Sequence, residues 1–341
     1  MTPQMLLKTC PLLTQPLTCK PLSGGNMNAV FLMQDSLGNE VVVKYAPPYL
    51  HLLGPSVPLS QERIRVEMHA LEYFGSIAPH VTPSVLYKDE ANFFMILEYK
   101  KDFITLREAH ILEVFNPKVY VKLGHFIGAL CANKPPKKPK SFYENQELKA
   151  ITNEYVFTIA FLENSDKTMP HPWFTPRPKS ARLLGNVAFL KTLFRTPSPH
   201  LIHGDLHTGS VLVRGEEIAV IDAEFAFFGP ISFDIGNLFA HIIMDGFGRE
   251  LSPSMALEVF WESFVQHSKL TCKELEAIFS QSVGFCGVEI ARRLVVPAKS
   301  PALESLAHKE EAYAHMDALS HRLIEEFRGI RTLDALLKIL P

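Results

Sequence analysis

The sequence contains few cysteines, and those present follow no recognisable pattern. There are five in 341 residues, Cys10, Cys19, Cys131, Cys272 and Cys286, and no two of them are spaced as C-x-x-C. An odd number of scattered cysteines argues against a disulfide framework and against a structural zinc site. We therefore expect reduced thiols, as in a cytoplasmic protein.

Long hydrophobic runs and an excess of charge of one sign are also missing. No stretch approaches the roughly 20 apolar residues of a membrane span, and residues 1–20 lack the pattern of a secretion signal. The formal net charge is -2, with 21% charged residues, so an electrostatic binder of nucleic acid is not indicated. We expect a cytoplasmic protein whose partner is a small molecule, with no nucleic acid and no membrane.

The hydrophobic pattern predicts an α+β protein with two lobes. Two β-branched runs around a polar turn are typical of a hairpin. A helix should begin with Ser60 as N-cap, because Ile64, Met68, Leu71 and Phe74 follow at helical spacing. The predicted strands of the first lobe are 29–34, 40–46, 81–86 and 92–99.

From Phe103 onward the pattern is mainly helical, with three short strands in the middle. The length of the chain favours two lobes over one core. We expect a small antiparallel β lobe in residues 1–100 and a larger, mainly helical lobe in residues 101–341. The predicted elements of the second lobe are helices at 120–132 and 180–194, strands at 201–203, 211–213 and 218–221, and helices between 253 and 340.

The residues that carry chemistry lie between these short strands. The sequence His-Gly-Asp-Leu-His-Thr-Gly-Ser occupies 203–210, and Ile-Asp-Ala-Glu follows at 221–224. One carboxylate in a loop and another at the next strand end is a layout that phosphoryl transfer uses for a catalytic base and a metal ligand. Asp205 would orient an acceptor hydroxyl, while Asp222 and Glu224 would hold Mg²⁺ against ATP phosphates. Each acid alone could be a turn or cap residue, but together they favour catalysis.

The small lobe contributes a candidate ion pair. Lys44 ends the run Val-Val-Val-Lys, and an ammonium group buried in a strand needs an anion. ATP phosphates and a helical glutamate would supply it. Glu67 is the candidate, with Glu62 close by. A glycine-rich turn at 23–30 could approach phosphate oxygens or be an ordinary hairpin turn.

These residues resemble the methylthioribose kinase family, a branch of the aminoglycoside-phosphotransferase and choline-kinase group with a protein-kinase-like fold. The catalytic-loop segment 203–210 is similar to that family as it stands, and so are the segments Phe-Ala-Phe-Phe-Gly-Pro-Ile at 225–231 and Phe-Asp-Ile-Gly at 233–236. Two distant segments agree as well: Pro58–Ser60 with Arg63, and 284–293, which ends in Arg292 and Arg293.

The resemblance implies a role for particular residues. Asp205 would be catalytic and sugar-binding, Arg292 and Arg293 would contact the sugar or the transferred phosphoryl group, and Asp234 would accept hydrogen bonds from the backbone of the catalytic loop. Contacts to ATP are implied for Asn28, Lys44, Glu67, the hinge residues Glu98, Tyr99 and Lys100, and the segment Asp222, Ala223 and Glu224, with metal at Asp222 and Glu224. The family also implies a homodimer.

Three positions depart from the family pattern. Ala223 stands where the family usually has proline, Val57 where it has tryptophan and Tyr99 where it has aspartate. The reaction we predict is the transfer of phosphate from ATP to the 1-hydroxyl of 5-methylthioribose, a step of methionine salvage. The alternatives are a kinase for another sugar or an amino alcohol, and an inactive nucleotide-binding relative.

Overall fold

The chain begins with an antiparallel five-stranded sheet in the computed structural model, which describes residues 11–14, 17–22, 27–162, 173–295 and 298–340. The strands lie in the order β1-β2-β3-β5-β4. The hairpin predicted at 29–46 is confirmed by β2 and β3, which pair in register. The strands of this sheet are β1 Leu17–Pro21, β2 Ala29–Asp35, β3 Glu40–Tyr45, β4 Val85–Asp89 and β5 Phe94–Glu98.

The prediction that β4 starts at residue 81 was wrong. Pro83 interrupts the segment and cannot donate to a strand ladder. The carbonyl of Val81 instead accepts a hydrogen bond from the backbone of Val220, at 2.7 Å, so this segment joins the sheet to the larger lobe.

Alternation along β3 separates two faces of the sheet. Val41 and Val43 are buried in a small core on one face, together with Met33 and Ile96. Because successive side chains of a strand point to opposite faces, Lys44 lies on the other face, toward the larger lobe. The same pattern that makes the strand therefore aims its only cation at the interior of the molecule.

Helix α2, Glu62–Ile77, packs on that second face and is confirmed by its buried stripe. Ile64, Met68, Leu71 and Phe74 are all buried, as their spacing predicted. The predicted N-cap was wrong, since Gln61 occupies that position, although the hydroxyl of Ser60 still accepts a hydrogen bond from the Glu62 backbone N–H at 3.2 Å.

Arg63, near the start of α2, is buried and holds the segment before the helix. Its guanidinium donates to the side chain of Asn28 and to the backbone carbonyls of Met27, Pro47 and Ser60. Burial lowers the pKa of Arg63. The cost of burying this cation is offset by satisfied hydrogen bonds, which fix the shape of the small lobe next to the cleft.

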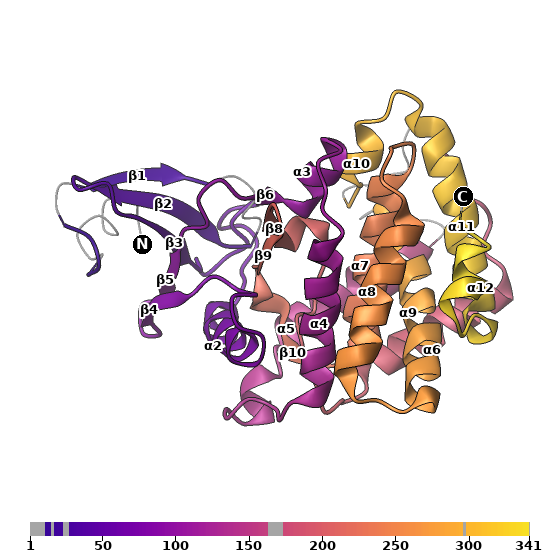
Figure 1. Ribbon diagram of the computed structural model, residues 1–341, viewed down its shortest axis with the longest axis horizontal. Coiled ribbons are helices and arrows are strands. Elements are labelled where there is room, and N and C mark those ends of the chain that lie inside the picture. Colours follow the sequence, from indigo (N-terminus) through magenta and orange to yellow (C-terminus); the bar gives the residue numbers. More distant parts are fainter. Residues whose placement is uncertain (1–10, 15–16, 23–26, 163–172, 296–297, 341) are drawn as a thin grey trace.

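The larger lobe is built from helices, and α7 lies at its centre with every residue buried (Figure 1). The predicted helices at 120–132 and 180–194 are confirmed by α4 and α6, and the hydroxyl of Ser180 caps α6. The α-helices of this lobe are α3 Leu106–Ile111, α4 Lys118–Ala132, α5 Gln146–Phe157, α6 Ala181–Arg195, α7 Ile231–Gly246, α8 Pro253–Ser268, α9 Cys272–Arg293, α10 Pro301–Glu304, α11 Lys309–Glu326 and α12 Leu333–Leu337. The 3₁₀ turns are η1 Lys140–Tyr143, η2 Ile159–Phe161, η3 Thr208–Ser210, η4 Ala223–Phe225 and η5 Phe327–Gly329.

Two small sheets lie where the lobes meet and carry the predicted site. Strands β6 Ile104–Thr105, β8 Val211–Arg214 and β9 Glu217–Val220 form one, and β7 Leu201–Ile202 pairs with β10 Phe227–Phe228 in the other. The segment 203–210 connects β7 to β8, and Asp222 follows the end of β9. Two short pairings thus fix both ends of the predicted catalytic segment.

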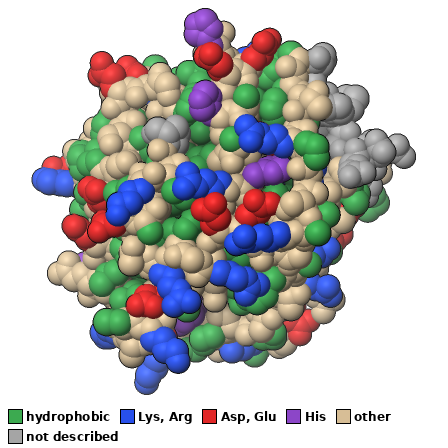
Figure 2. All heavy atoms as spheres, turned by 90° about the vertical axis from the view of Figure 1, so that its right-hand side faces the viewer, with side chains coloured by type: hydrophobic (Ala, Val, Ile, Leu, Met, Phe, Trp, Pro, Cys, Tyr) green, Lys and Arg blue, Asp and Glu red, His purple; other side chains and the backbone are tan. Residues whose placement is uncertain are grey.

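Figure 2 shows the outer face of the helical lobe. Acidic and basic side chains are interspersed with apolar ones over this face. In the described part of the chain, no helix is long and apolar enough to cross a bilayer. Cys19, Cys131, Cys272 and Cys286 are free thiols.

Glycine sets the distance between α4 and α8. A Cβ built on Gly124 would lie 2.3 Å from the carbonyl oxygen of Phe260 and 2.9 Å from the backbone nitrogen of Phe264, both in α8. Contacts this short with backbone atoms require the helices to separate. The close approach of the two helices therefore depends on this glycine.

Gly124→Ala should lower the free energy of unfolding by about 1–3 kcal/mol, because the added methyl group overpacks a rigid contact. Gly185→Ala, in α6, is the matched control, since a Cβ at Gly185 would have no neighbouring atom within 4 Å. That change should stabilise the protein by about 0.5–1 kcal/mol. Urea unfolding followed by circular dichroism measures both; equal stability of Gly124→Ala and wild type would contradict the packing argument.

Candidate active site

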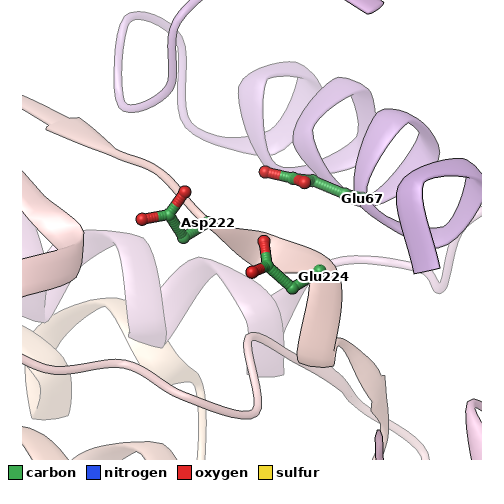
Figure 3. A group of neighbouring side chains, drawn as sticks. All are labelled: Glu67, Asp222 and Glu224. Carbon is green, nitrogen blue, oxygen red and sulfur yellow. The ribbon is translucent and has the colours of Figure 1, made fainter. Parts of the chain in front are cut away.

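A single ammonium group joins the two lobes. The Nζ atom of Lys44 lies 2.7 Å from Glu67 Oε1, 2.6 Å from Asp222 Oδ1 and 2.8 Å from Glu224 Oε2. Glu67 comes from α2, while Asp222 and Glu224 follow β9, and the three carboxylates point toward one another (Figure 3). The predicted pairing of Lys44 with Glu67 is present. Glu62, the alternative, pairs with Arg65 instead.

This cluster contains more negative charge than its lysine can balance. Burial opposes the charged form of Lys44, yet the three carboxylates raise its pKa well above the usual range. Burial raises the pKa of Glu67 well above its usual range even though Lys44 opposes the change. Asp222 is 44% exposed and opens the cluster to the cleft. Three carboxylates with one cation fit a divalent metal ion, whose preferred ligands are carboxylate oxygens.

A buried carboxylate binds the backbone at the start of segment 203–210. Asp234, in the first turn of α7, accepts hydrogen bonds from the backbone N–H groups of His203, at 2.7 Å, and Gly204, at 2.9 Å. Gly204 has a φ of +81°, and a Cβ there would lie 2.2 Å from the carbonyl oxygen of Phe225. The turn before Asp205 therefore requires glycine. The role that the resemblance implies for Asp234 is present in these contacts.

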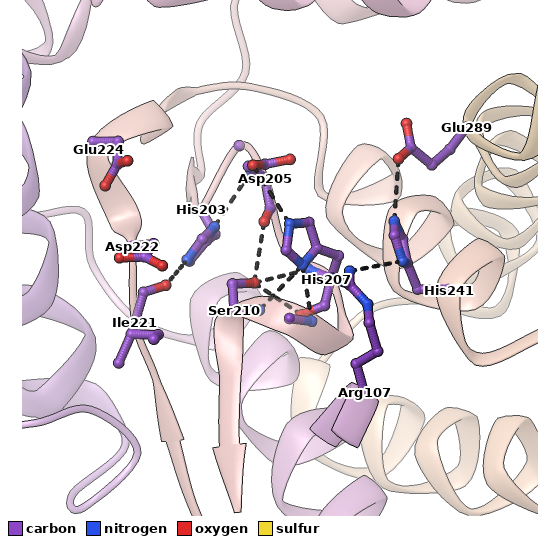
Figure 4. Close-up of polar contacts among 12 residues, drawn as sticks. Arg107, His203, Asp205, His207, Ser210, Ile221, Asp222, Glu224, His241 and Glu289 are labelled. Atoms are coloured by element: carbon purple, nitrogen blue, oxygen red, sulfur yellow. Dashed lines mark hydrogen bonds and ion pairs between the residues drawn. The ribbon is translucent and has the colours of Figure 1, made fainter. Parts of the chain in front are cut away.

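The imidazole of His203 connects segment 203–210 to the segment of the predicted metal ligands. Its Nε2 atom lies 2.8 Å from the carbonyl oxygen of Ile221, and its Nδ1 accepts a hydrogen bond from the backbone N–H of Asp205 at 3.3 Å. Since a carbonyl only accepts, Nε2 carries the proton. One ring thus ties the residue before Asp222 to Asp205, and both acids lie beside it in Figure 4.

His207 and Ser210 shape the loop. The Nδ1 atom of His207 accepts hydrogen bonds from the backbone of Gly209 and Ser210, at 2.9 and 3.1 Å. Burial lowers the pKa of His207 well below its usual range, so the ring is neutral. The hydroxyl of Ser210, at the position where protein kinases carry a metal-binding asparagine, donates to backbone carbonyls of the loop. Ser210 therefore acts here as a loop residue.

Arginines gather on the other side of Asp205. Glu289 of α9 is buried and accepts from Arg292 Nη1 at 3.0 Å and from Arg293 Nε at 2.6 Å. Burial raises the pKa of Asp205, and the charges of Arg292 and Arg293 oppose that rise. The two predicted substrate residues lie in the last turn of α9, and their charges act on Asp205.

A cleft of about 360 Å³ lies between the lobes at this place. Apolar side chains from both lobes line it, including Val42, Leu97 and Leu212, and Lys44 and Asp222 face it. The predicted hinge, Glu98 to Lys100, lines the same cleft. The Glu98 side chain accepts hydrogen bonds from the backbone and hydroxyl of Ser84, each at 3.1 Å, and so anchors the hinge to the preceding loop.

Some predicted contacts remain predictions, and some residues were missed. Asn28 is buried with its oxygen bound to Arg63, and its contact with ATP is untested. Residues 23–26 of the predicted glycine-rich turn lie outside the described part of the chain. The sequence did not point to Arg107 or His241. Glu289 could have been found from its helical spacing, three and four residues before Arg292 and Arg293.

Comparisons with known proteins agree with this geometry. The phosphotransferase enzyme family matches residues 18–260. A methylthioribose kinase from Geobacillus kaustophilus is 32% identical over 92% of this chain and 88% of its own length. A methylthioribose kinase from Yersinia enterocolitica is 28% identical over 94% of this chain and 91% of its own length. The resemblance predicted from the catalytic-loop residues is thus confirmed.

Solved structures show the fold alone. A choline/ethanolamine kinase family protein from Mesorhizobium loti superposes with a TM-score of 0.56 at 18% identity, over 98% of this chain and 97% of that one. A microcompartment-associated aminopropanol kinase gives a TM-score of 0.58 at 15% identity, over 97% and 98%. The predicted α+β fold, with a sheet lobe and a helical lobe, is confirmed.

The support of the catalytic loop by Asp234 predicts a pH dependence of stability. Burial raises the pKa of this carboxyl from 3.8 to about 6. Because the folded state then binds the proton more tightly than the unfolded state, the contribution of this group to stability falls as the pH rises from about 4 to about 6. Asp234→Asn removes this titration. The stability advantage of wild type over the variant should therefore shrink across that interval, by up to about 3 kcal/mol.

Urea unfolding at pH 4, 5, 6 and 7 measures the difference between Asp234→Asn and wild type. Asp102→Asn, at an exposed position with a positive φ that asparagine tolerates, is the control and should give no such trend. An advantage of wild type that is constant or grows between pH 4 and 6 would contradict the prediction.

Proposed function

The chain belongs to the phosphotransferase enzyme family, and within it to the family of the methylthioribose kinases, and from this premise we propose that it transfers the γ-phosphoryl group of ATP to 5-methylthioribose. The acceptor is the 1-hydroxyl, and the products are ADP and 5-methylthioribose 1-phosphate. The observation that carries the proposal is the arrangement around segment 203–210. A lysine–carboxylate cluster lies on one side of it and the arginine pair on the other.

The proposed reaction is an in-line displacement at phosphorus. A bond forms between the acceptor oxygen and the γ-phosphorus of ATP, and the bond from that phosphorus to the bridging β,γ-oxygen breaks, leaving ADP. Asp205 orients the hydroxyl and receives its proton, which then passes to solvent. The raised pKa of Asp205 supports this role, because a more basic carboxylate accepts the proton more readily.

On the nucleotide side, Lys44 would bind ATP phosphates while Glu67 holds the ammonium in place. Mg²⁺, when bound, neutralises charge on the phosphate oxygens, and Asp222 with Glu224 would be its protein ligands. The cluster of three carboxylates supports this assignment. Residues 98–100 and 223 would complete the nucleotide contacts, with the hinge backbone meeting adenine.

The charge on the acceptor side supports a neutral or anionic acceptor. Arg292 and Arg293 interact electrostatically with Asp205, and Glu289 is the one carboxylate that pairs with both arginines among the described residues. A cationic amino alcohol would be repelled by these guanidinium groups, whereas sugar hydroxyls can accept hydrogen bonds from them. This argues for a sugar over the alternative of a choline-like substrate.

Several finer expectations follow from the same premise. We propose that residues 1–100 serve as the nucleotide-binding lobe and that residues 101–341 carry the catalytic loop and the acceptor site. The place of the reaction would be methionine salvage. The expectations of a homodimer and of a cytoplasmic location stay predictions.

The activity is tested by ADP release with four acceptors in parallel: 5-methylthioribose, ribose, choline and an aminoglycoside. We expect the highest kcat/KM with 5-methylthioribose. Asp205→Asn should lower kcat by about 10²–10⁴-fold, the usual contribution of a positioned base, while the affinity for ATP stays unchanged. Asp102→Asn, at the exposed position used above, should be as active as wild type.

Two results would overturn these assignments separately. Preferred turnover of choline or the aminoglycoside would contradict the acceptor but not the kinase reaction. An Asp205→Asn enzyme with wild-type kcat would contradict the catalytic assignment for every acceptor.

The metal assignment is tested with Glu224→Gln, which keeps the size of the side chain but removes its charge. The Mg²⁺ concentration for half-maximal activity should rise by about tenfold or more, since a charged ligand is lost. Electron paramagnetic resonance of bound Mn²⁺ provides a reading that does not depend on turnover. Glu217→Gln, at an exposed residue paired with Arg214, should change neither value, and unchanged metal affinity in Glu224→Gln would refute the assignment.

A further inference from the structure

A third arginine lies on the acceptor side of the catalytic loop. Arg107 belongs to α3, and its Nη2 atom is 3.3 Å from His241 Nδ1 in α7. The guanidinium also packs against Gly209, where a Cβ would lie 2.8 Å from Arg107 Nη1. The absence of a side chain at Gly209 therefore lets Arg107 approach the loop that carries Asp205 (Figure 4).

A chain of contacts connects Arg107 to the arginine pair. Arginine is always a donor, so His241 Nδ1 accepts from Arg107 and its Nε2–H points to Glu289 Oε1 at 3.2 Å. Burial lowers the pKa of His241 to about 4, which keeps the ring neutral and able to accept. Glu289 in turn binds Arg292 and Arg293. Helices α3, α7 and α9 thus bring three guanidinium groups together around one imidazole and one carboxylate.

Arg107 differs from the other two arginines in its counter-charge. Arg292 and Arg293 share Glu289. Among the described residues, Arg107 forms no ion pair with a carboxylate within 4.0 Å. Its Nε is buried and has no hydrogen-bond partner among the described residues, and the same is true of Arg292 Nε. A partly buried cation with a free donor favours an anion as its partner.

The position of Arg107 indicates which anion this is. The ATP side of the site already has its own cation in Lys44. Arg107 packs on Gly209, in the same segment as Asp205, and is hydrogen-bonded to His241, which pairs with Glu289, so it lies on the side of the arginine pair. A neutral sugar brings no anion to that side before the reaction, but the transferred phosphoryl group does.

We propose that Arg107 binds the phosphoryl group as it reaches the acceptor and in the sugar 1-phosphate product, and that His241 and Glu289 position the three arginines for this purpose. The inference rests on the proposed kinase function and adds a residue on the product side of that site. Arg107 contacts the transferred group, while His241 and Glu289 act through the arginines. Charge developing on the phosphoryl oxygens then meets guanidinium donors that are already oriented.

The test compares wild type with Arg107→Gln, which retains a donor for His241 but loses the charge, and with Arg107→Lys, which retains a charge. Calorimetric titrations in the presence of Mg²⁺ and ADP give the Kd of 5-methylthioribose 1-phosphate and of unphosphorylated 5-methylthioribose. Arg107→Gln should bind the phosphate at least about tenfold more weakly, because a charge-assisted hydrogen bond is lost. Binding of the neutral sugar and the KM for ATP should stay within about twofold of wild type, because no charge-assisted bond to either is removed.

Steady-state kinetics provide a second reading. Arg107→Gln should lower kcat by about 10²-fold with little change in the KM for the sugar, as expected when an interaction with the transition state is lost. Arg107→Lys should recover part of both losses. Arg322→Gln, at an exposed residue of α11, is the control for removal of an arginine and should behave as wild type.

The outcomes separate this inference from the proposed function. Equal weakening of the phosphate and of the neutral sugar, or unchanged phosphate affinity, would overturn the role of Arg107. If wild type turns over a different acceptor, the proposed substrate fails, and the same comparison is made with that acceptor and its phosphate. If Arg107→Gln does not fold, Arg107→Lys and Arg107→Met are compared instead. Weaker binding of the phosphate by Arg107→Met than by Arg107→Lys, with equal binding of the neutral sugar, supports the role of the charge. Equal phosphate affinity in these two variants overturns it.

Discussion

The contact of the Lys44 ammonium with three carboxylates is the interaction on which the site depends. It is made by one strand of the sheet, one helix of the small lobe and the segment after β9, so it fixes the two lobes relative to each other. Breaking a buried ion pair by removing one partner leaves an uncompensated charge. The cluster therefore needs the charge of Lys44, and its excess of carboxylates supports the proposal that a nucleotide-bound metal ion binds here.

The catalytic loop is also held in place by buried polar contacts. Asp234 binds two of its backbone N–H groups, and His203 connects Asp205 to the carbonyl before Asp222. These contacts fix the position of the proposed catalytic carboxylate, because the buried N–H groups would otherwise lack hydrogen-bond acceptors. Because the loop is supported by helix α7 and by strand β9 at once, the acceptor side and the metal side cannot shift independently.

The parts of the site that could be predicted from the sequence are those whose residues lie close together in the chain and form a recognisable pattern. A lysine at the end of a β-branched strand needs an anion, and two acids at consecutive strand ends predict a shared site. Contacts between distant helices leave no such pattern. Arg107 and His241 are separated by 134 residues, and each is an ordinary polar residue of its own helix. The start of α2 was misplaced for a related reason, since Arg63 serves the packing of the preceding segment and not the helix cap.

The two sides of the catalytic loop carry opposite charge, and this asymmetry supports the proposed transfer. Carboxylates outnumber cations around Lys44, which suits a metal ion that arrives with the nucleotide. Guanidinium groups outnumber carboxylates among Arg107, Arg292, Arg293 and Glu289, which suits an anion that is created there by the reaction. A phosphoryl group moving from the first place to the second exchanges one set of counter-charges for another. In the proposed reaction the guanidinium groups would interact more strongly with the phosphoryl group in the transition state than in bound ATP, and only such a difference accelerates the transfer.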